Sequence, residues 1–291
     1  MSCYSSLLVV VVFLSTSASC FLFGHQPEWN GLRVKFGFPG ISKAYSDMPR
    51  TVNDAVEDGF ELLDNQCQTT DQTFRGQRYW KGKDPALVLL YDKNGYIAGI
   101  QTSIPKTKYV PTSIQGNTSI DIDGDRYTLT AYFVEPRIIC TTGRSEGDFD
   151  EDGTGTGLYL QNGTNPERDL AVIPRNEDDI KNTVWGNGKC FFGMGQHYWF
   201  NVRKNMNCDE FFPYCVLYTR GKLNAFCFAV DKNIEPSVRY EHPDANAASK
   251  CCLNIPDCFK TDPRYTNGKK QSTMHVFMTN RPYLTNNCLP F

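Results

Sequence analysis

Apolar residues recur at helical spacing in one stretch of the chain, residues 51–63 (TVNDAVEDGFELL). Spacings of four, four and three place these residues on one side of an α-helix, which turns once every 3.6 residues. Thr51 precedes the first of them and can cap the helix, because its side-chain oxygen can accept a backbone N–H of the first turn. The pattern predicts a helix over 51–63 whose buried side is formed by Val52, Val56, Phe60 and Leu63.

Runs rich in β-branched and aromatic residues follow this predicted helix. Two of them, LVLLYD (87–92) and YIAGIQ (96–101), flank Lys93-Asn94-Gly95. Asn-Gly favours a β-hairpin because it tolerates the positive φ of a tight turn. A further run, YTLTAYFV (127–134), adds another strand. A helix followed by antiparallel strands predicts the α+β class, with the helix packed on the sheet.

The same series of landmarks occurs twice along the chain, in the same order. Each copy has a Pro-Arg pair, a Gly-Gln-x-Tyr-Trp motif, two apolar runs, a further strand and a closing cysteine. So many matches in one order favour a tandem duplication over chance. The matched segments are 48–54 with 173–179, 76–80 with 195–199, 85–100 with 213–228, 127–137 with 272–282, and Cys140 with Cys288.

The duplication predicts two α+β repeats, residues 21–140 and 158–291. Residues 141–157 (TTGRSEGDFDEDGTGTG) are rich in glycine and acidic residues without apolar periodicity, so we expect a linker there. The second repeat contains most of the cysteines. The expected fold is therefore a tandem duplication of a helix-on-antiparallel-sheet domain that disulfides stabilise.

Residues 1–20 have the features of a secretory signal peptide. An apolar run from Leu7 to Leu14 precedes small residues suited to cleavage. The run is too short to cross a bilayer, which takes about 20 residues. We therefore expect a secreted protein without a membrane span.

The cysteine content agrees with an extracellular location. Of the 12 cysteines, cleavage after Cys20 removes two and leaves ten, an even number suited to disulfides. No CxxC pair occurs, which argues against a reduced zinc protein. Adjacent Cys251 and Cys252 are expected to pair with different partners. The ten cysteines are Cys67, Cys140, Cys190, Cys208, Cys215, Cys227, Cys251, Cys252, Cys258 and Cys288.

Two sequons and the charge balance bear on the partners of the protein. Asn117 (NTS) and Asn162 (NGT) are candidate N-glycosylation sites. The net charge is −2 and the basic residues are dispersed, so nothing indicates nucleic acid as a partner. We expect an extracellular ligand or a matrix component instead.

Histidine distinguishes the two repeats. His197 stands where the first repeat has Arg78, and His275 stands where it has Thr130. Convergence of these two histidines, with His242 as a third ligand, would suit copper or zinc. The alternative is that both are hydrogen-bonded, half-buried strand residues, since no HxH or HExxH motif fixes a metal geometry.

An acidic motif in the predicted linker suggests a calcium site. DFDEDG (148–153) places Asp148, Asp150 and Asp152 at alternate positions, as in the first half of an EF-hand loop. Tyr159 occupies the twelfth position, where that loop needs an acidic residue. A solvated acidic linker is the alternative.

Two classes of function remain open. The first is a secreted, disulfide-rich glycoprotein that acts as an extracellular binding or matrix component. The second is a secreted copper- or zinc-dependent enzyme whose site lies in the second repeat. No GxSxG motif or unpaired cysteine indicates a nucleophile. A protease inhibitor is a third option, although the sequence lacks the expected inhibitory loop.

Overall fold

The computed structural model describes residues 27–35, 45–68, 73–106, 121–230, 238–243, 256–261, 271–286 and 288. The predicted signal peptide 1–20, the sequon at Asn117, and Cys251 and Cys252 lie outside these residues. Among the described helices, none combines the length and the hydropathy that crossing a membrane requires.

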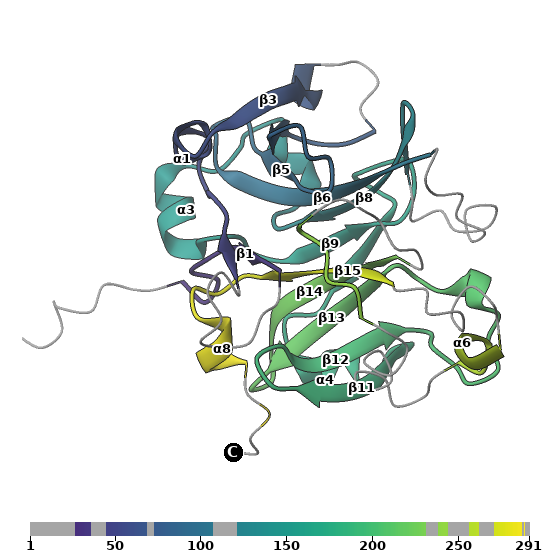
Figure 1. The fold of residues 1–291 in the computed structure, drawn as a ribbon. Coiled ribbons are helices and arrows are strands. Elements are labelled where there is room, and N and C mark those ends of the chain that lie inside the picture. Colours follow the sequence, from purple (N-terminus) through teal and green to yellow (C-terminus); the bar gives the residue numbers. More distant parts are fainter. Residues whose placement is uncertain are drawn as a thin grey trace, which may run out of the picture.

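Two antiparallel β-sheets make up most of the structure (Figure 1). The first sheet has the strand order β10-β9-β8-β6-β5-β4-β3, with β7 beside β8, and the second has the order β11-β12-β13-β14-β15-β1-β2. The strands of the first sheet are β3 (Phe60–Asn65), β4 (Gln77–Lys81), β5 (Val88–Tyr91), β6 (Ile97–Pro105), β7 (Asp121–Asp123), β8 (Arg126–Tyr132), β9 (Leu158–Gln161) and β10 (Leu170–Ile173). The strands of the second are β11 (Trp185–Phe191), β12 (Gly195–Phe200), β13 (Tyr214–Thr219), β14 (Lys222–Val230), β15 (Ser272–Phe277), β1 (Arg33–Val34) and β2 (Ser46–Asp47).

The described helices are short, so the structure is a mixed fold dominated by sheet. The α-helices are α1 (Val52–Glu57), α2 (Pro136–Ile139), α3 (Glu146–Asp152), α4 (Glu177–Ile180), α6 (Cys258–Thr261) and α8 (Pro282–Thr285), and the 3₁₀ helices are η1 (Gln66–Gln68) and η3 (Cys208–Glu210).

The helix predicted over 51–63 is shorter than its periodicity suggested. Thr51 caps α1 by accepting the backbone N–H of Asp54, as expected. The helix ends before Gly59, which has a φ of 81°, and the next residue, Phe60, begins β3. The helical spacing therefore overestimated the helix, because a left-handed glycine turns the chain into a strand.

The β5–β6 hairpin forms where Lys93-Asn94-Gly95 predicted it. The two strands pair antiparallel, and Gly95 has a φ of 89°. This part of the sequence prediction is confirmed.

The two sheets pack face to face and share one large hydrophobic core. Phe133 of the first sheet's half contacts Phe226 of the second, with ring centroids 6.3 Å apart. The hydroxyl of Tyr214 also bonds the backbone of Thr130 across the interface. Each sheet has a smaller apolar cluster on the side away from this core. We call this side the outer face of each sheet.

Each half of the chain contributes one hairpin to the sheet that is formed mainly by the other half. The β1–β2 hairpin, although early in the sequence, pairs with β15 of the second sheet. The β9–β10 hairpin, which begins the predicted second repeat, pairs with β8 of the first sheet. The predicted boundary at 141–157 therefore does not coincide with the boundary between the sheets.

Equivalent contacts recur at matching places in the two sheets. A bulge lies directly before Tyr91 in the β5–β6 pairing and directly before Tyr218 in the β13–β14 pairing. The Tyr91 hydroxyl donates to the carbonyl of Pro49, and the Tyr218 hydroxyl donates to that of Pro174. Each Pro-Arg segment thus contacts the corresponding strand of its own half, β5 in the first and β13 in the second.

The predicted linker contains a regular element, helix α3. Ser145 caps it by accepting the backbone N–H of Asp148, and the Asp148 carboxylate accepts the Ser145 backbone N–H in return. This capping box explains why a glycine-rich, acidic stretch without apolar periodicity forms a helix.

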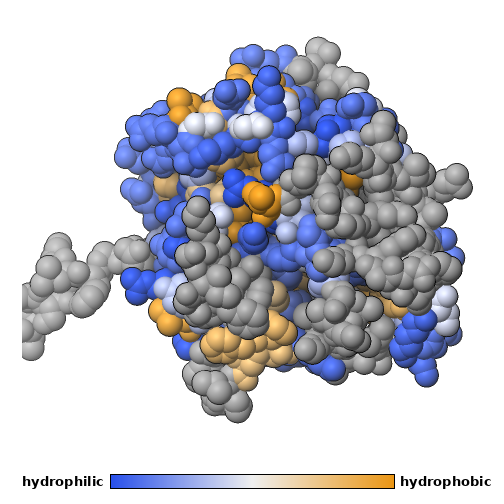
Figure 2. Space-filling model, in the orientation of Figure 1, coloured by the Kyte–Doolittle hydropathy of each residue, from blue (hydrophilic) through white to orange (hydrophobic). Residues whose placement is uncertain are grey.

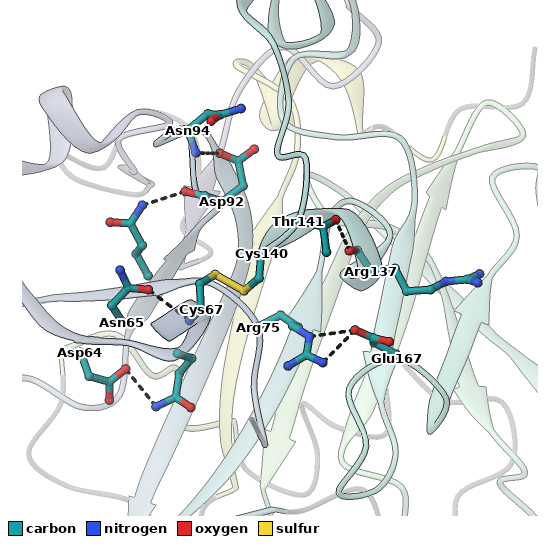
Figure 3. The surroundings of a disulfide bond; sticks show 12 residues. Asp64, Asn65, Cys67, Arg75, Asp92, Asn94, Arg137, Cys140, Thr141 and Glu167 are labelled. Atoms are coloured by element: carbon teal, nitrogen blue, oxygen red, sulfur yellow. Dashed lines mark hydrogen bonds and ion pairs between the residues drawn. A yellow bond between two sulfur atoms is a disulfide. The ribbon is translucent and has the colours of Figure 1, made fainter. Parts of the chain in front are cut away.

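Four disulfides link the eight described cysteines in pairs: Cys67–Cys140, Cys190–Cys288, Cys208–Cys258 and Cys215–Cys227. Figure 3 shows the first of these, between η1 and the end of α2. Each half of the chain has one of these bonds ending at its closing cysteine: the first half has Cys67–Cys140, and the second has Cys190–Cys288. None of the eight is left to pair with Cys251 or Cys252.

Candidate metal centre

Four neighbouring strands of the second sheet bring two histidines and two cysteines onto its outer face. His197 lies on β12, Cys215 on β13, Cys227 on β14 and His275 on β15. Cys227 is directly opposite both Cys215 and His275 in the pairing register. We call these four residues the outer-face quartet.

His197 has one ring nitrogen whose role is fixed by the backbone. Its Nδ1 lies 3.2 Å from the carbonyl of Lys189 and 3.1 Å from that of Gly195. Carbonyl oxygens only accept hydrogen bonds, so Nδ1 carries the proton and Nε2 presents a lone pair. Nε2 is buried and has no hydrogen-bond partner among the described residues.

Burial also decides the charge of His197. The side chain is only 1% exposed. This burial, and after it the neighbouring His275, lower the pKa of His197 to about 3. The ring is therefore neutral over the physiological range, which is the form that binds a metal ion.

His275 lies beside His197 and is oriented by a carboxylate. The two ring centroids are 6.0 Å apart, with the rings nearly perpendicular. Nδ1 of His275 lies 3.3 Å from Oε2 of Glu241, which is held next to β15 by a bridge between Glu241 and Thr273. A carboxylate behind a histidine fixes its tautomer and raises its basicity as a ligand.

Three members of the quartet have nearly the spacing that a metal ion needs, and Cys227 is not part of this group. One ligand atom each from His197, Cys215 and His275 lies within 4.8 Å of the others, the one such group among the described residues. A tetrahedral ion with bonds of about 2.0–2.3 Å holds its ligand atoms about 3.3–3.8 Å apart. Small side-chain shifts would thus suffice. Because a thiolate is the form that binds a metal, the disulfide leaves the histidines as the ligands of the oxidised protein.

The same four positions in the first sheet have a different chemistry. The strand registers match Arg78 with His197, Val88 with Cys215, Gln101 with Cys227 and Thr130 with His275. Here the Gln101 amide donates to the Thr130 hydroxyl at 2.9 Å. No pair of metal-binding side chains stands at these positions.

Arg78 is the centre of an ion-pair network in the first sheet. It is 4% exposed and pairs with both Asp64 and Asp123. Its guanidinium also lies 5.2 Å from the centroid of the Phe74 ring. The position that holds a histidine with an unpartnered nitrogen in one sheet therefore holds a fully paired cation in the other.

His242, the third predicted ligand, is not part of the three-residue group. Its Nδ1 lies 3.3 Å from the Ser272 hydroxyl. His242 directly follows Glu241 in the sequence, and it is Glu241 that contacts His275. The structure thus brings His197 and His275 together and places Glu241, not His242, beside the pair.

The structure does not gather the predicted calcium ligands Asp148, Asp150 and Asp152. All three belong to α3, and no described group of metal-binding side chains includes them. Residues two apart on a helix point in different directions, and the Asp148 carboxylate is occupied by the cap with Ser145. The alternation of acidic residues was compared with the first half of a calcium loop, whereas these residues form a helix in the structure.

Asn162 follows the last residue of β9, in the β9–β10 hairpin. Its side chain is half-buried, and its backbone N–H donates to the carbonyl of Asp169. This position at a hairpin end is compatible with a surface sequon.

Sequence reasoning missed three members of the site: Cys215, Cys227 and Glu241. The cysteines were treated only as disulfide partners. An available signal was strand alternation, which places Cys215 and Cys227 on the side opposite Val216 and Phe226. Glu241 had no local signal, because its contact with His275 crosses 34 residues of sequence.

Comparison of the chain with family models, with curated proteins and with solved structures found no match.

Proposed function

We propose that this chain is a secreted, disulfide-stabilised glycoprotein that acts as an extracellular binding protein and holds one copper or zinc ion through His197 and His275. Four disulfides support an oxidising compartment. The signal peptide predicted at 1–20 and the candidate sequons at Asn117 and Asn162 agree with that location.

The unpartnered Nε2 of His197 carries the proposal. A buried polar atom without a hydrogen bond costs about 1–3 kcal/mol. His197 Nε2 is one of five such side-chain atoms among the described residues, and His197 alone of these five residues belongs to a group of metal-binding side chains. A metal ion shared with His275 would compensate, because its bond replaces the missing hydrogen bond. The backbone carbonyls behind His197 and the Glu241 carboxylate behind His275 are the partners that metal-binding histidines usually have.

The burial of the pair favours binding over the alternative, a copper or zinc enzyme. Catalytic zinc keeps one position open for water or substrate. His197 is 1% and His275 7% exposed, and a groove of about 430 Å³ lies elsewhere, lined by residues that include Arg50, Asp54 and Phe149. A centre closed in this way suits retention of an ion more than turnover of a substrate.

We also propose that the chain is a tandem duplication in which each repeat gives its first hairpin to the other repeat's sheet. The matched tyrosine contacts, bulges and disulfides of the two halves support this. The exchange is reciprocal, since β1–β2 extends the second sheet at β15 and β9–β10 extends the first at β8. Two repeats linked in this way form one structural unit with a common core.

The test is metal stoichiometry in the purified, oxidised protein. Stripped of metal and titrated with Zn²⁺ or Cu⁺, the wild-type chain should bind one equivalent. His275→Thr, which introduces the first sheet's residue, should bind none while keeping its circular dichroism. His242→Ala is the matched control and should bind like wild type. A wild-type chain that binds neither ion would refute the metal centre.

A further inference from the structure

The outer-face quartet differs from its counterparts in the first sheet at all four positions. Arg, Val, Gln and Thr in the first sheet correspond to His, Cys, Cys and His in the second. Each of the four residues in the second sheet is a metal-ligand type, and Cys₂His₂ is a common ligand set for tetrahedral zinc. Cys215 and Cys227, which form a disulfide, are therefore also candidate metal ligands.

The geometry places the Cys215 sulfur next to the histidine nitrogens, and the Cys227 sulfur is bonded to it. Sγ of Cys215 belongs to the group within 4.8 Å. The register aligns Cys215, Cys227 and His275 in one row across three strands. His197 lies on the adjacent strand, with its unpartnered Nε2 buried.

We infer that the Cys215–Cys227 disulfide is a redox switch on this centre, and that its reduction creates a four-ligand Cys₂His₂ site for Zn²⁺. The inference rests on the proposed function, because it uses the same two histidines. It adds that the metal affinity depends on the oxidation state of one disulfide.

The chemistry requires a thiol reductant, here a dithiol. The dithiol gives two electrons to the disulfide, its own sulfurs join in a new disulfide, and Cys215 and Cys227 each become a thiol. Zn²⁺ then displaces one proton from each thiol as two Zn–S bonds form. A disulfide oxidant reverses the exchange: it accepts two electrons and becomes a dithiol, Cys215 and Cys227 join again in a disulfide, and the ion is released.

Charge explains why the two states should differ strongly. Two neutral imidazoles bring no negative charge to the coordination shell of Zn²⁺, so in the oxidised protein the Glu241 carboxylate behind His275 offsets only part of the charge of the buried ion. Two thiolates neutralise the ion within its own coordination shell. Cys215 and Cys227 are 0% and 1% exposed, so this neutralisation takes place away from water.

The first experiment measures zinc affinity by competition with a chromophoric chelator, before and after treatment with dithiothreitol. Alkylation and mass spectrometry identify the reduced cysteines, and circular dichroism reports the fold. Reduced wild type should bind Zn²⁺ at least about a hundredfold more tightly than oxidised wild type. Co²⁺ bound in its place should show thiolate charge-transfer absorption.

Two variants make the test independent of reduction elsewhere. Cys227→Ala leaves Cys215 as a thiol beside both histidines with the other disulfides intact, and it should bind Zn²⁺ more tightly than Cys215→Ala/Cys227→Ala. Cys208→Ala/Cys258→Ala lacks a disulfide outside the quartet and should retain the full response to reduction.

The outcomes separate the inference from the proposed function. Equal zinc affinity in folded protein with the disulfide intact and with it reduced would overturn the switch but leave the histidine centre. Equal affinity of Cys227→Ala and the double alanine variant would also overturn the switch. Zinc binding only after reduction would support the switch and refute metal binding by the oxidised protein.

Discussion

The outer faces of the two sheets share a framework and differ in chemistry. Arg78 and His197 occupy the same register position, yet Arg78 is paired on all sides and His197 has a buried nitrogen without a partner. A framework needs satisfied polar groups, whereas a binding site keeps some groups available for a ligand. The two faces therefore differ in ligand chemistry: His197 belongs to a group of metal-binding side chains, whereas Arg78 and Gln101, whose Oε1 is also unpartnered, do not.

The largest expected effect is on the free energy of unfolding, and it tests whether the long-loop disulfides stabilise the two sheets equally. Cys67–Cys140 and Cys190–Cys288 close loops of 73 and 98 residues, so their entropic contributions should be nearly equal, at about 4–5 kcal/mol each. Double alanine variants at either pair should lower the free energy of unfolding by similar amounts in denaturant titrations. Cys215–Cys227, with a separation of 12, should contribute about 3 kcal/mol. A loss confined to one of the two long loops would show that the sheets are not equivalent.

The next effect tests the exchange of hairpins. Trp29, just before β1, is fully buried and donates its indole N–H to the carbonyl of Leu223 in the second sheet. Trp29→Ala should cost about 4 kcal/mol. Amide hydrogen exchange should accelerate first in β14 and β15, not in the first sheet. Val56→Ala, at a position 57% exposed, is the control and should change little. Faster exchange in the first sheet alone would contradict the pairing.

Replacing Arg78 and His197 by leucine compares what the two matched residues contribute to stability. Arg78→Leu leaves Asp64 and Asp123 without their partner and should cost about 3 kcal/mol, a moderate value because both carboxylates are one-third exposed. His197→Leu removes the unpartnered Nε2 but also the Nδ1 donor to the carbonyls of Lys189 and Gly195, so it should cost about 1–2 kcal/mol in metal-free buffer, less than Arg78→Leu. Equal losses in chemical unfolding would make His197 a structural residue.

The smallest effect is a pH dependence. His197 has a pKa of about 3 in the folded state and about 6.5 when unfolded, so the unfolded chain binds more protons between these values. Stability of the metal-free protein should therefore fall by about 1 kcal/mol from this group as the pH drops from 6.5 to 5.5, and further towards pH 3. In His197→Gln the fall should be shallower. Identical pH profiles in denaturant titrations would contradict the assigned burial effect.

The sequence predicted those features that depend on local pattern. The turn at Lys93-Asn94-Gly95 and the strands around it formed as expected, because Asn-Gly and alternation act over a few residues. The end of α1 at Gly59 and the capped helix α3 were missed, since periodicity alone does not weigh a left-handed glycine or a capping box. The partners of the hairpins could not be predicted, because pairing between distant strands depends on the whole fold.

The metal centre was predictable only in part. Comparing the two halves singled out His197 and His275, and the structure places their rings side by side. The sequence match aligned Cys215 with Leu87, whereas the strand register aligns it with Val88. For Cys215 that shift of one residue corresponds to the other face of a sheet, whereas Cys227 shifts by two residues, from Gly99 to Gln101, and keeps its face. Both cysteines were missed because they were considered only as disulfide partners.

Anomalous diffraction at a metal absorption edge, from crystals of the oxidised protein grown with Zn²⁺, tests whether His197 and His275 bind a metal ion. The account predicts one peak on the outer face of the second sheet, about 2.0–2.1 Å from Nε2 of His197 and in contact with His275. Crystals with a well-ordered His197 and no peak between the two rings would contradict it.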